Sequence, residues 1–198
     1  AVGVEGGGVG AGVGVCWARK SERRVLTLVP CASGGGTAFT KHKSMPSVWA
    51  SVETGVCGLQ GLRDSMEDAH ISMPSFLSSS SKLVDLASSK SAPLHFFGVL
   101  DGHGGEACAE YCGDALPKQL KKSLSSGLPI SASLVTAHAA VEVDWFREAD
   151  RDDSGTTAVT ALIESASGRV LASNVGDSRV LVVRRSGKSG SKVVALTR

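Results

Sequence analysis

The sequence has no long apolar run, little net charge and few cysteines, and each absence argues against a class of protein. No apolar stretch approaches the length that a membrane span requires, so we expect no membrane partner. The formal net charge of +2 argues against a surface dedicated to nucleic acid or to a membrane. The five cysteines are odd in number and scattered, which is typical of reduced thiols in an intracellular protein. We therefore expect a monomeric cytoplasmic or nuclear protein.

The composition fits one globular domain. A chain of 198 residues can bury an adequate core, and a hydrophobic content of 42% with 20% charged residues is in the globular range. Cys108 and Cys112 are four residues apart, so a helix would place them on one face. No further ligands accompany them, and we expect two half-buried core thiols rather than a metal site.

The first quarter of the chain, residues 1–51, has the composition of a low-complexity leader. Ala1–Gly14 is rich in glycine and valine without an amphipathic period, and a basic patch follows at residues 19–24. We predict that this leader is disordered and that the folded domain covers residues 52–198. The basic, acid-poor composition is also compatible with an organellar transit peptide, which stays open beside a solvated tail.

The rest of the chain alternates between strand and helix patterns. A serine-rich segment, about 75–92, is predicted to be an exposed insertion. Pro117 is expected to kink or split the first helix, and Ser131 or Ser133 to cap the second. Strands, two helices and then strands predict sheets covered by helices, an α+β fold. The expected strands are 54–62, 69–73, 94–100, 156–163, 169–174, 179–183 and 192–196, and the expected helices are 106–124 and about 131–149.

One stretch, Leu94–Gly105, combines a buried strand with chemically useful residues. The apolar run ends at Asp101, which a glycine turn and His103 follow. A carboxylate at the lip of a sheet is well placed to hold a metal or ligand, and Gly102 lets the backbone approach it and offers a carbonyl oxygen. The alternative is an ordinary strand–turn–helix connection with a solvated Asp101.

Three further motifs decide between these interpretations. They are Arg63–His70 (RDSMEDAH), Asp153–Ala158 (DSGTTA) and Asn174–Arg179 (NVGDSR). With Asp101–Gly105 (DGHGG), these motifs in this order resemble the PP2C (PPM) family of metal-dependent protein serine/threonine phosphatases. The resemblance runs from about Gly55 to Arg198. It implies a sandwich of two antiparallel β-sheets flanked by helices, phosphorylated proteins as substrates, and two Mg²⁺ or Mn²⁺ ions as cofactors.

The resemblance also implies a ligand set for the metal ions. Asp101 would bridge both ions, and Glu67 and the Gly102 carbonyl would bind one of them. Asp68 faces the opposite way from Glu67 in regular β geometry, so it takes a water-mediated part. Asp177 matches a family aspartate that belongs to an additional, weaker metal site. Oxygen ligands of this kind suit Mg²⁺ or Mn²⁺ rather than zinc.

Two residues receive catalytic roles from the same resemblance. Arg63 would bind the substrate phosphate through its fork of donors, and His103 would donate a proton to the leaving oxygen. The alternative for Arg63 is an ion pair with Glu67 or Asp68, and the alternative for Asp177 is a hairpin turn. The Ser154–Thr157 segment is interpreted as a turn entering a core strand. His138, on the second predicted helix, is interpreted as a packing residue.

The chain also departs from the family pattern. The family's later aspartates, which complete the second metal's ligands, have no counterparts here, so we expect an incomplete catalytic domain. The serine-protease alternative suggested by Gly176–Ser178 is disfavoured because its glycine-rich continuation is absent. The remaining alternative is a non-catalytic, phosphatase-like protein that binds phosphoproteins or other partners without turnover.

Overall fold

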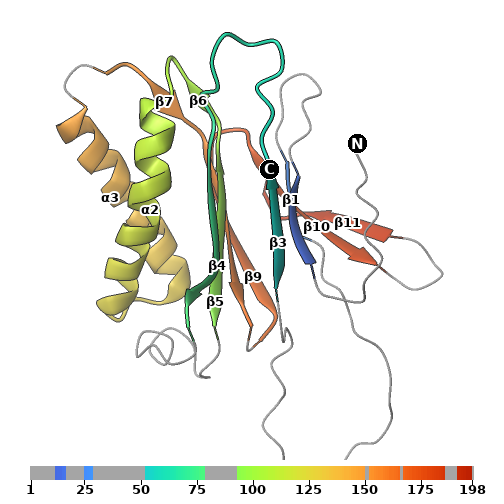
Figure 1. The fold of residues 1–198 in the computed structure, drawn as a ribbon. Helices are drawn as coiled ribbons and strands as arrows, with labels where there is room; N and C mark the ends of the chain where they lie inside the picture. The colour runs from blue at the N-terminus through green and yellow to red at the C-terminus, as the bar shows by residue number, and fades with distance from the viewer. Residues whose placement is uncertain are drawn as a thin grey trace, which may run out of the picture.

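The computed structural model describes residues 12–16, 25–28, 52–78, 93–149, 152–165, 167–185 and 191–197. These residues form three layers (Figure 1). Two helices cover one face of a four-stranded sheet, and a second group of strands lies on its opposite face. The predicted α+β fold with antiparallel sheets and outer helices is therefore confirmed.

The four-stranded sheet is antiparallel and has the strand order β4-β5-β8-β9. Its strands are β4 (Ala69–Leu77), β5 (Leu94–Leu100), β8 (Ala158–Glu164) and β9 (Arg169–Val175). Side chains of β5 alternate between two cores, because successive residues of a strand face opposite ways. Phe96 and Leu100 pack in the core that includes the helices, whereas Phe97 and Val99 pack in the core that includes Val180 of the other strand group.

The helices are α2 (Ala107–Ser125) and α3 (Ile130–Glu148), and they pack against each other and against the sheet. Of the two outcomes expected at Pro117, a kink or a split, the split is contradicted, since α2 runs through Pro117 as one helix. Neither expected serine caps α3. Pro129 is its N-cap residue, and the Ser133 hydroxyl donates instead to the Leu128 carbonyl, at 3.2 Å. Among the described residues, no helix is long and apolar enough to cross a membrane.

The second strand group includes two strands that lie within the predicted leader. β1 (Gly12–Cys16) pairs in parallel with β3 (Glu53–Cys57), and β2 (Val25–Leu28) pairs in parallel with β10 (Arg179–Arg185). β11 (Ser191–Ala195) pairs with β10 in the antiparallel sense. The two leader strands were not expected from the sequence. Valine supports strand formation in both, but their strand partners lie far along the chain.

Several element boundaries differ from the expected ones. β3 ends at Cys57 rather than at residue 62, and a loop leads from there to β4. β4 continues to Leu77 and so takes in the start of the predicted insertion, whereas residues 79–92 lie outside the described residues. The expected strand 156–163 is interrupted at Thr157, which separates β7 (Gly155–Thr156) from β8.

Candidate active site

Asp101 directly follows β5. At this end of the sheet the Asp101–Gly105 motif meets the motifs Arg63–His70 and Asp153–Ala158. Gly102 and His103 form β6, which pairs with Gly155 and Thr156 of β7. Thr157 fixes the backbone of Asp101 twice: its N–H donates to the Asp101 carbonyl at 2.9 Å, and its hydroxyl oxygen accepts from the Asp101 N–H at 3.2 Å. Thr157, which lies between β7 and β8, therefore fixes the backbone of the half-buried Asp101.

Glu67 and Asp68 reach the same end of the sheet because they immediately precede β4. Ala69 pairs with Leu100, so the residues just before Ala69 lie beside those just after Leu100. Gly102 is in close contact with the backbone of Glu67, since a Cβ at position 102 would overlap the Glu67 carbonyl oxygen. The contact explains why the turn needs glycine. It brings together the two segments from which ligands were predicted.

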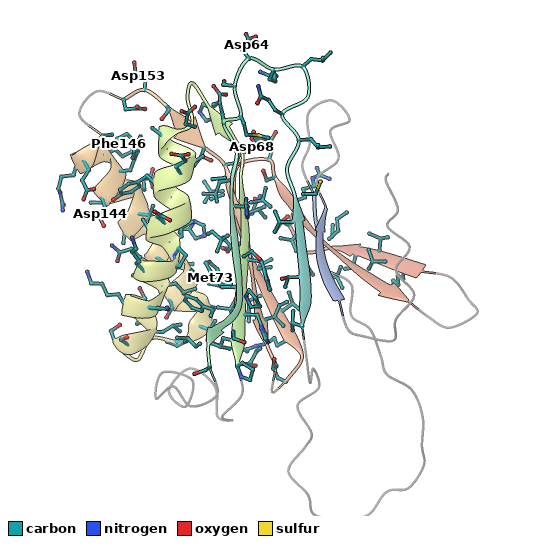
Figure 2. All side chains as sticks on the ribbon, in the orientation of Figure 1. Asp64, Asp68, Met73, Asp144, Phe146 and Asp153 are labelled. Carbon is teal, nitrogen blue, oxygen red and sulfur yellow. The ribbon has the colours of Figure 1, made fainter. Side chains whose placement is uncertain are left out.

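Arg63 and Asp177 lie on loops at the border of this region. Arg63 is exposed in the loop before β4, and its carbonyl accepts a hydrogen bond from the Gln60 side chain at 2.7 Å. Figure 2 shows this loop rising above the sheet, with Asp64 at its tip and Asp68 at its base. Asp177 is exposed in the turn between β9 and β10.

Two residues of the quoted motifs have structural roles that were not assigned from the sequence. The Thr157 hydroxyl lies 2.7 Å from the Ser178 hydroxyl, and Ser178 is only 1% exposed. The turn that carries Asp177 is thereby linked to the backbone of Asp101. Each of the two motifs contains a small hydroxyl residue, Thr157 or Ser178, but sequence spacing does not reveal that the two hydroxyls meet.

The donors at this end of the sheet are chemically suited to a hard cation. Among the described residues, no group of three or more His, Cys, Asp or Glu side chains is arranged to hold a metal ion. Mg²⁺, however, is commonly bound through one or two carboxylates and keeps several waters. Asp101 and Glu67 offer two carboxylates, and the carbonyl of Gly102 adds a third oxygen. This donor set fits Mg²⁺ or Mn²⁺.

His103 borders a cavity of about 590 Å³ between the helices and the β7 loop, which is the segment 152–154 that leads into β7. The His103 ring packs on Gly155, where an added Cβ would lie 2.5 Å from Nε2. Cys108 and Cys112 line the cavity as free thiols, and they belong to the core as predicted but are buried rather than half-buried. Burial and the neighbouring Cys108 thiol raise the pKa of Cys112 to about 12, so it stays protonated. His138 bonds the Ser173 hydroxyl of β9 at 2.9 Å, which agrees with a packing role.

Comparisons with known proteins point to one family. The family profile for protein phosphatase 2C matches residues 52–198. The chain is 33% identical over 132 residues to protein phosphatase 2C homolog 2 of Saccharomyces cerevisiae, covering 65% of the chain and 26% of that protein. It is 37% identical over 136 residues to protein phosphatase 2C homolog 2 of Schizosaccharomyces pombe, covering 66% of the chain and 34% of that protein. The chain thus spans about a quarter to a third of the length of these relatives.

The fold is also similar to a solved structure. The structure of a C. elegans sex determining protein matches 71% of this chain and 32% of its own chain, with a TM-score of 0.53 and 22% sequence identity. At this level of identity the match supports the arrangement of the strands and helices and says nothing about chemistry.

Proposed function

Because the chain belongs to the protein phosphatase 2C family, we propose that it serves in the metal-dependent hydrolysis of phosphoserine and phosphothreonine in proteins. The observation that carries this proposal is the contact between Gly102 and the Glu67 backbone. It brings the Asp101 turn and the Glu67 loop together at one end of the sheet. Two segments far apart in the sequence thus contribute oxygen donors to one place.

Each acidic residue has a distinct part in the proposed site. Asp101 and Glu67 would hold Mg²⁺ or Mn²⁺ through their carboxylates, together with the Gly102 carbonyl. Asp68 would act through water, and Asp177 would belong to an additional, weaker site. When bound, such ions neutralise phosphoryl oxygens and lower the pKa of a water molecule, so that it can attack phosphorus near neutral pH. Two ions are expected in the complete site.

Arg63 and His103 would act on the substrate directly. The planar guanidinium of Arg63 presents paired donors that match two phosphoryl oxygens, and the exposed loop leaves it free to reach them. His103 would donate a proton to the serine or threonine oxygen as the ester bond breaks. The ring packs against Gly155, beside the Asp101 turn.

A non-catalytic role is the second candidate, and the donor count favours it. The described residues provide fewer than three grouped acidic, histidine or cysteine side chains, so metal affinity should be weak and turnover slow. A phosphatase-like chain of this kind would bind phosphorylated proteins through Arg63 and a single weakly held cation. Binding without phosphate release distinguishes it from the enzyme.

Calorimetric titration with Mn²⁺ tests the proposed metal site. We expect the 198-residue chain to bind Mn²⁺ and the variant D101N to bind at least about tenfold more weakly, a difference of roughly 1.4 kcal/mol. D114N is the matched control, because Asp114 is an exposed carboxylate on α2, outside the candidate site. Equal binding by D101N and the unmodified chain would remove the site.

Phosphate release tests the reaction itself. The substrate is a phosphothreonine peptide with Mn²⁺, with and without a chelator. Slow release that the chelator and D101N both abolish supports the enzyme. Peptide binding without release supports the non-catalytic candidate, and brisk release in the presence of chelator contradicts the metal-dependent mechanism.

A further inference from the structure

The cavity beside His103 is preformed by hydrogen bonds between its walls. The Ser154 hydroxyl accepts from the backbone N–H of Cys108 at 3.1 Å, which ties the β7 loop to the first turn of α2. The Asp152 carboxylate accepts from the Ser154 N–H at 2.8 Å and fixes the start of the same loop. The loop therefore holds its position against α2, and the volume of about 590 Å³ lies within the range typical of ligand-binding sites.

The interior and the rim of the cavity differ in chemistry. Its interior is apolar and includes the buried side chains of Leu116 and Val141. Trp145 and Phe146 add two aromatic rings from the last turn of α3, and Phe146 is largely exposed. Figure 2 shows Phe146 at this end of α3, with Asp153 on the neighbouring loop.

Three carboxylates surround this apolar interior: Glu142 of α3 and Asp152 and Asp153 of the loop. The hydrogen bonds from Ser154 lower the pKa of Asp152 below its usual value, so it is charged at neutral pH. The described residues that line the cavity include no lysine or arginine; its basic side chains are the histidines His103 and His138, and burial lowers the pKa of His138. The C-terminal end of α3 adds the partial negative charge of its dipole, and the N-terminal end of α2 at Cys108 adds a partial positive charge that the three carboxylates outweigh. The rim therefore favours a cation.

We propose that this cavity is a subsite for an arginine side chain of the phosphorylated substrate. Arginine has an apolar stem that suits the interior, a planar guanidinium that stacks on aromatic rings, and donors that match carboxylates. An apolar side chain would leave the three carboxylates without a counter-charge. A lysine ammonium would stack less well on Trp145 and Phe146.

The position of His103 links the subsite to the substrate phosphate, and this step rests on the proposed function. His103 lines the cavity and is also the proposed donor to the leaving oxygen. Consecutive residues of an extended peptide are about 3.3 to 3.8 Å apart along the chain. An arginine within two residues of the phosphorylated residue can therefore reach the cavity. The chain should prefer phosphopeptides with arginine at one of these positions.

Binding of fluorescent phosphothreonine peptides to the 198-residue chain tests the subsite by anisotropy. The peptides differ only in carrying arginine or its neutral isostere citrulline at one position, scanned from two residues before to two residues after the phosphothreonine. At one position, we expect the arginine peptide to bind about tenfold more tightly. The ratio of the arginine-peptide affinity to the citrulline-peptide affinity should fall to about one in the double variant E142Q/D153N. It should fall in the same way in A139F, because the added ring occupies the cavity from its exposed rim.

The matched control is E110Q, which removes an exposed α2 carboxylate that does not line the cavity and should keep the full ratio. Equal binding of arginine and citrulline peptides at every position would overturn the subsite, as would a preference that survives in both cavity variants. Unphosphorylated peptides separate this result from the proposed function. An arginine preference that persists while phosphate adds no affinity supports the subsite and counts against the phosphatase site.

Discussion

The hydroxyl of Thr157 joins two loops of the candidate site, since it lies 2.7 Å from the Ser178 hydroxyl and accepts a hydrogen bond from the Asp101 N–H. Thr157 sits between β7 and β8, Ser178 precedes β10, and Asp101 follows β5. A single oxygen atom therefore couples three connections that are far apart in the sequence. Removing it should disturb the metal site without replacing any proposed metal ligand.

The first prediction follows from that coupling. T157V keeps the side-chain shape but leaves the buried Ser178 hydroxyl and the Asp101 N–H without this partner, which should cost about 1–3 kcal/mol of unfolding free energy. T157S, which keeps the hydroxyl, should restore most of that loss and Mn²⁺ affinity near that of the unmodified chain. Urea denaturation and Mn²⁺ calorimetry measure the two effects. Unchanged Mn²⁺ affinity in T157V would show that Asp101 is positioned without Thr157.

The second prediction concerns the close approach at Gly102. In G102A, the new methyl group would overlap the Glu67 carbonyl and approach the Ala109 side chain at 3.2 Å. Forced repacking of this kind typically costs about 1–3 kcal/mol. G58A is the matched control, because the nearest neighbour of its added methyl is the Met66 side chain at 3.9 Å. Urea midpoints of the two variants should therefore separate, and equal midpoints would contradict the contact.

The third prediction is a pH dependence that centres on the buried His95. Its Nδ1 accepts a hydrogen bond from the Ser75 N–H at 3.1 Å, so the ring proton lies on Nε2, which is 2.7 Å from the Ser165 hydroxyl. The bond from the Ser75 N–H to His95 holds Ser75 in a left-handed conformation, with φ of 63°, at an irregularity of β4. Burial lowers the pKa of His95, because the charged ring is poorly solvated there.

The sign of the effect follows from this lowered pKa. The unfolded chain takes up the His95 proton near the ordinary value of about 6.5, whereas the folded chain takes it up at lower pH. The contribution of His95 to the free energy of unfolding is therefore fully present above that value, and it decreases as the pH falls toward the pKa of the folded state. Urea unfolding at pH 7.5 and 5.0 should show the fall. H95N keeps an acceptor near Nδ1 and cannot titrate, so its fall should be smaller.

His138 needs its own control, because burial lowers its pKa as well. The double variant H95N/H138N should show the smallest change between the two pH values. If H95N loses as much stability on acidification as the unmodified chain, His95 is not the responsible group.

The fourth prediction concerns proton donation by His103. H103Q removes the proposed acid, which should slow phosphothreonine hydrolysis by roughly 10²–10⁴-fold. An aryl phosphate has a better leaving group and needs less proton donation, so its loss should be smaller. Phosphate release from a phosphothreonine peptide and from p-nitrophenyl phosphate compares the two. Equal losses on both substrates would contradict the general-acid role.

Much of the central sheet and the family were predictable from local sequence. β5 matches its predicted bounds, Leu94–Leu100, because a continuous apolar run flanked by Pro93 and Asp101 leaves little choice. The short strand patterns that became β9, β10 and β11 were placed within a few residues, since their apolar runs are punctuated by glycine turns. The family was predicted from four ordered motifs, and the profile match to residues 52–198 confirms it.

The sequence by itself indicated the four strands of the central sheet and the candidate site residues, because both depend on local pattern and residue type, but it did not reveal β1 or β2. Only the tertiary structure decided that Thr157 meets Ser178, that Glu67 touches Gly102, and that a cavity opens beside His103. These contacts join residues at least twenty positions apart. These contacts depend on the register of the strands and on how the helices pack against the sheet. A hydrophobic period in the sequence specifies which face of an element is buried, but not which other element covers that face.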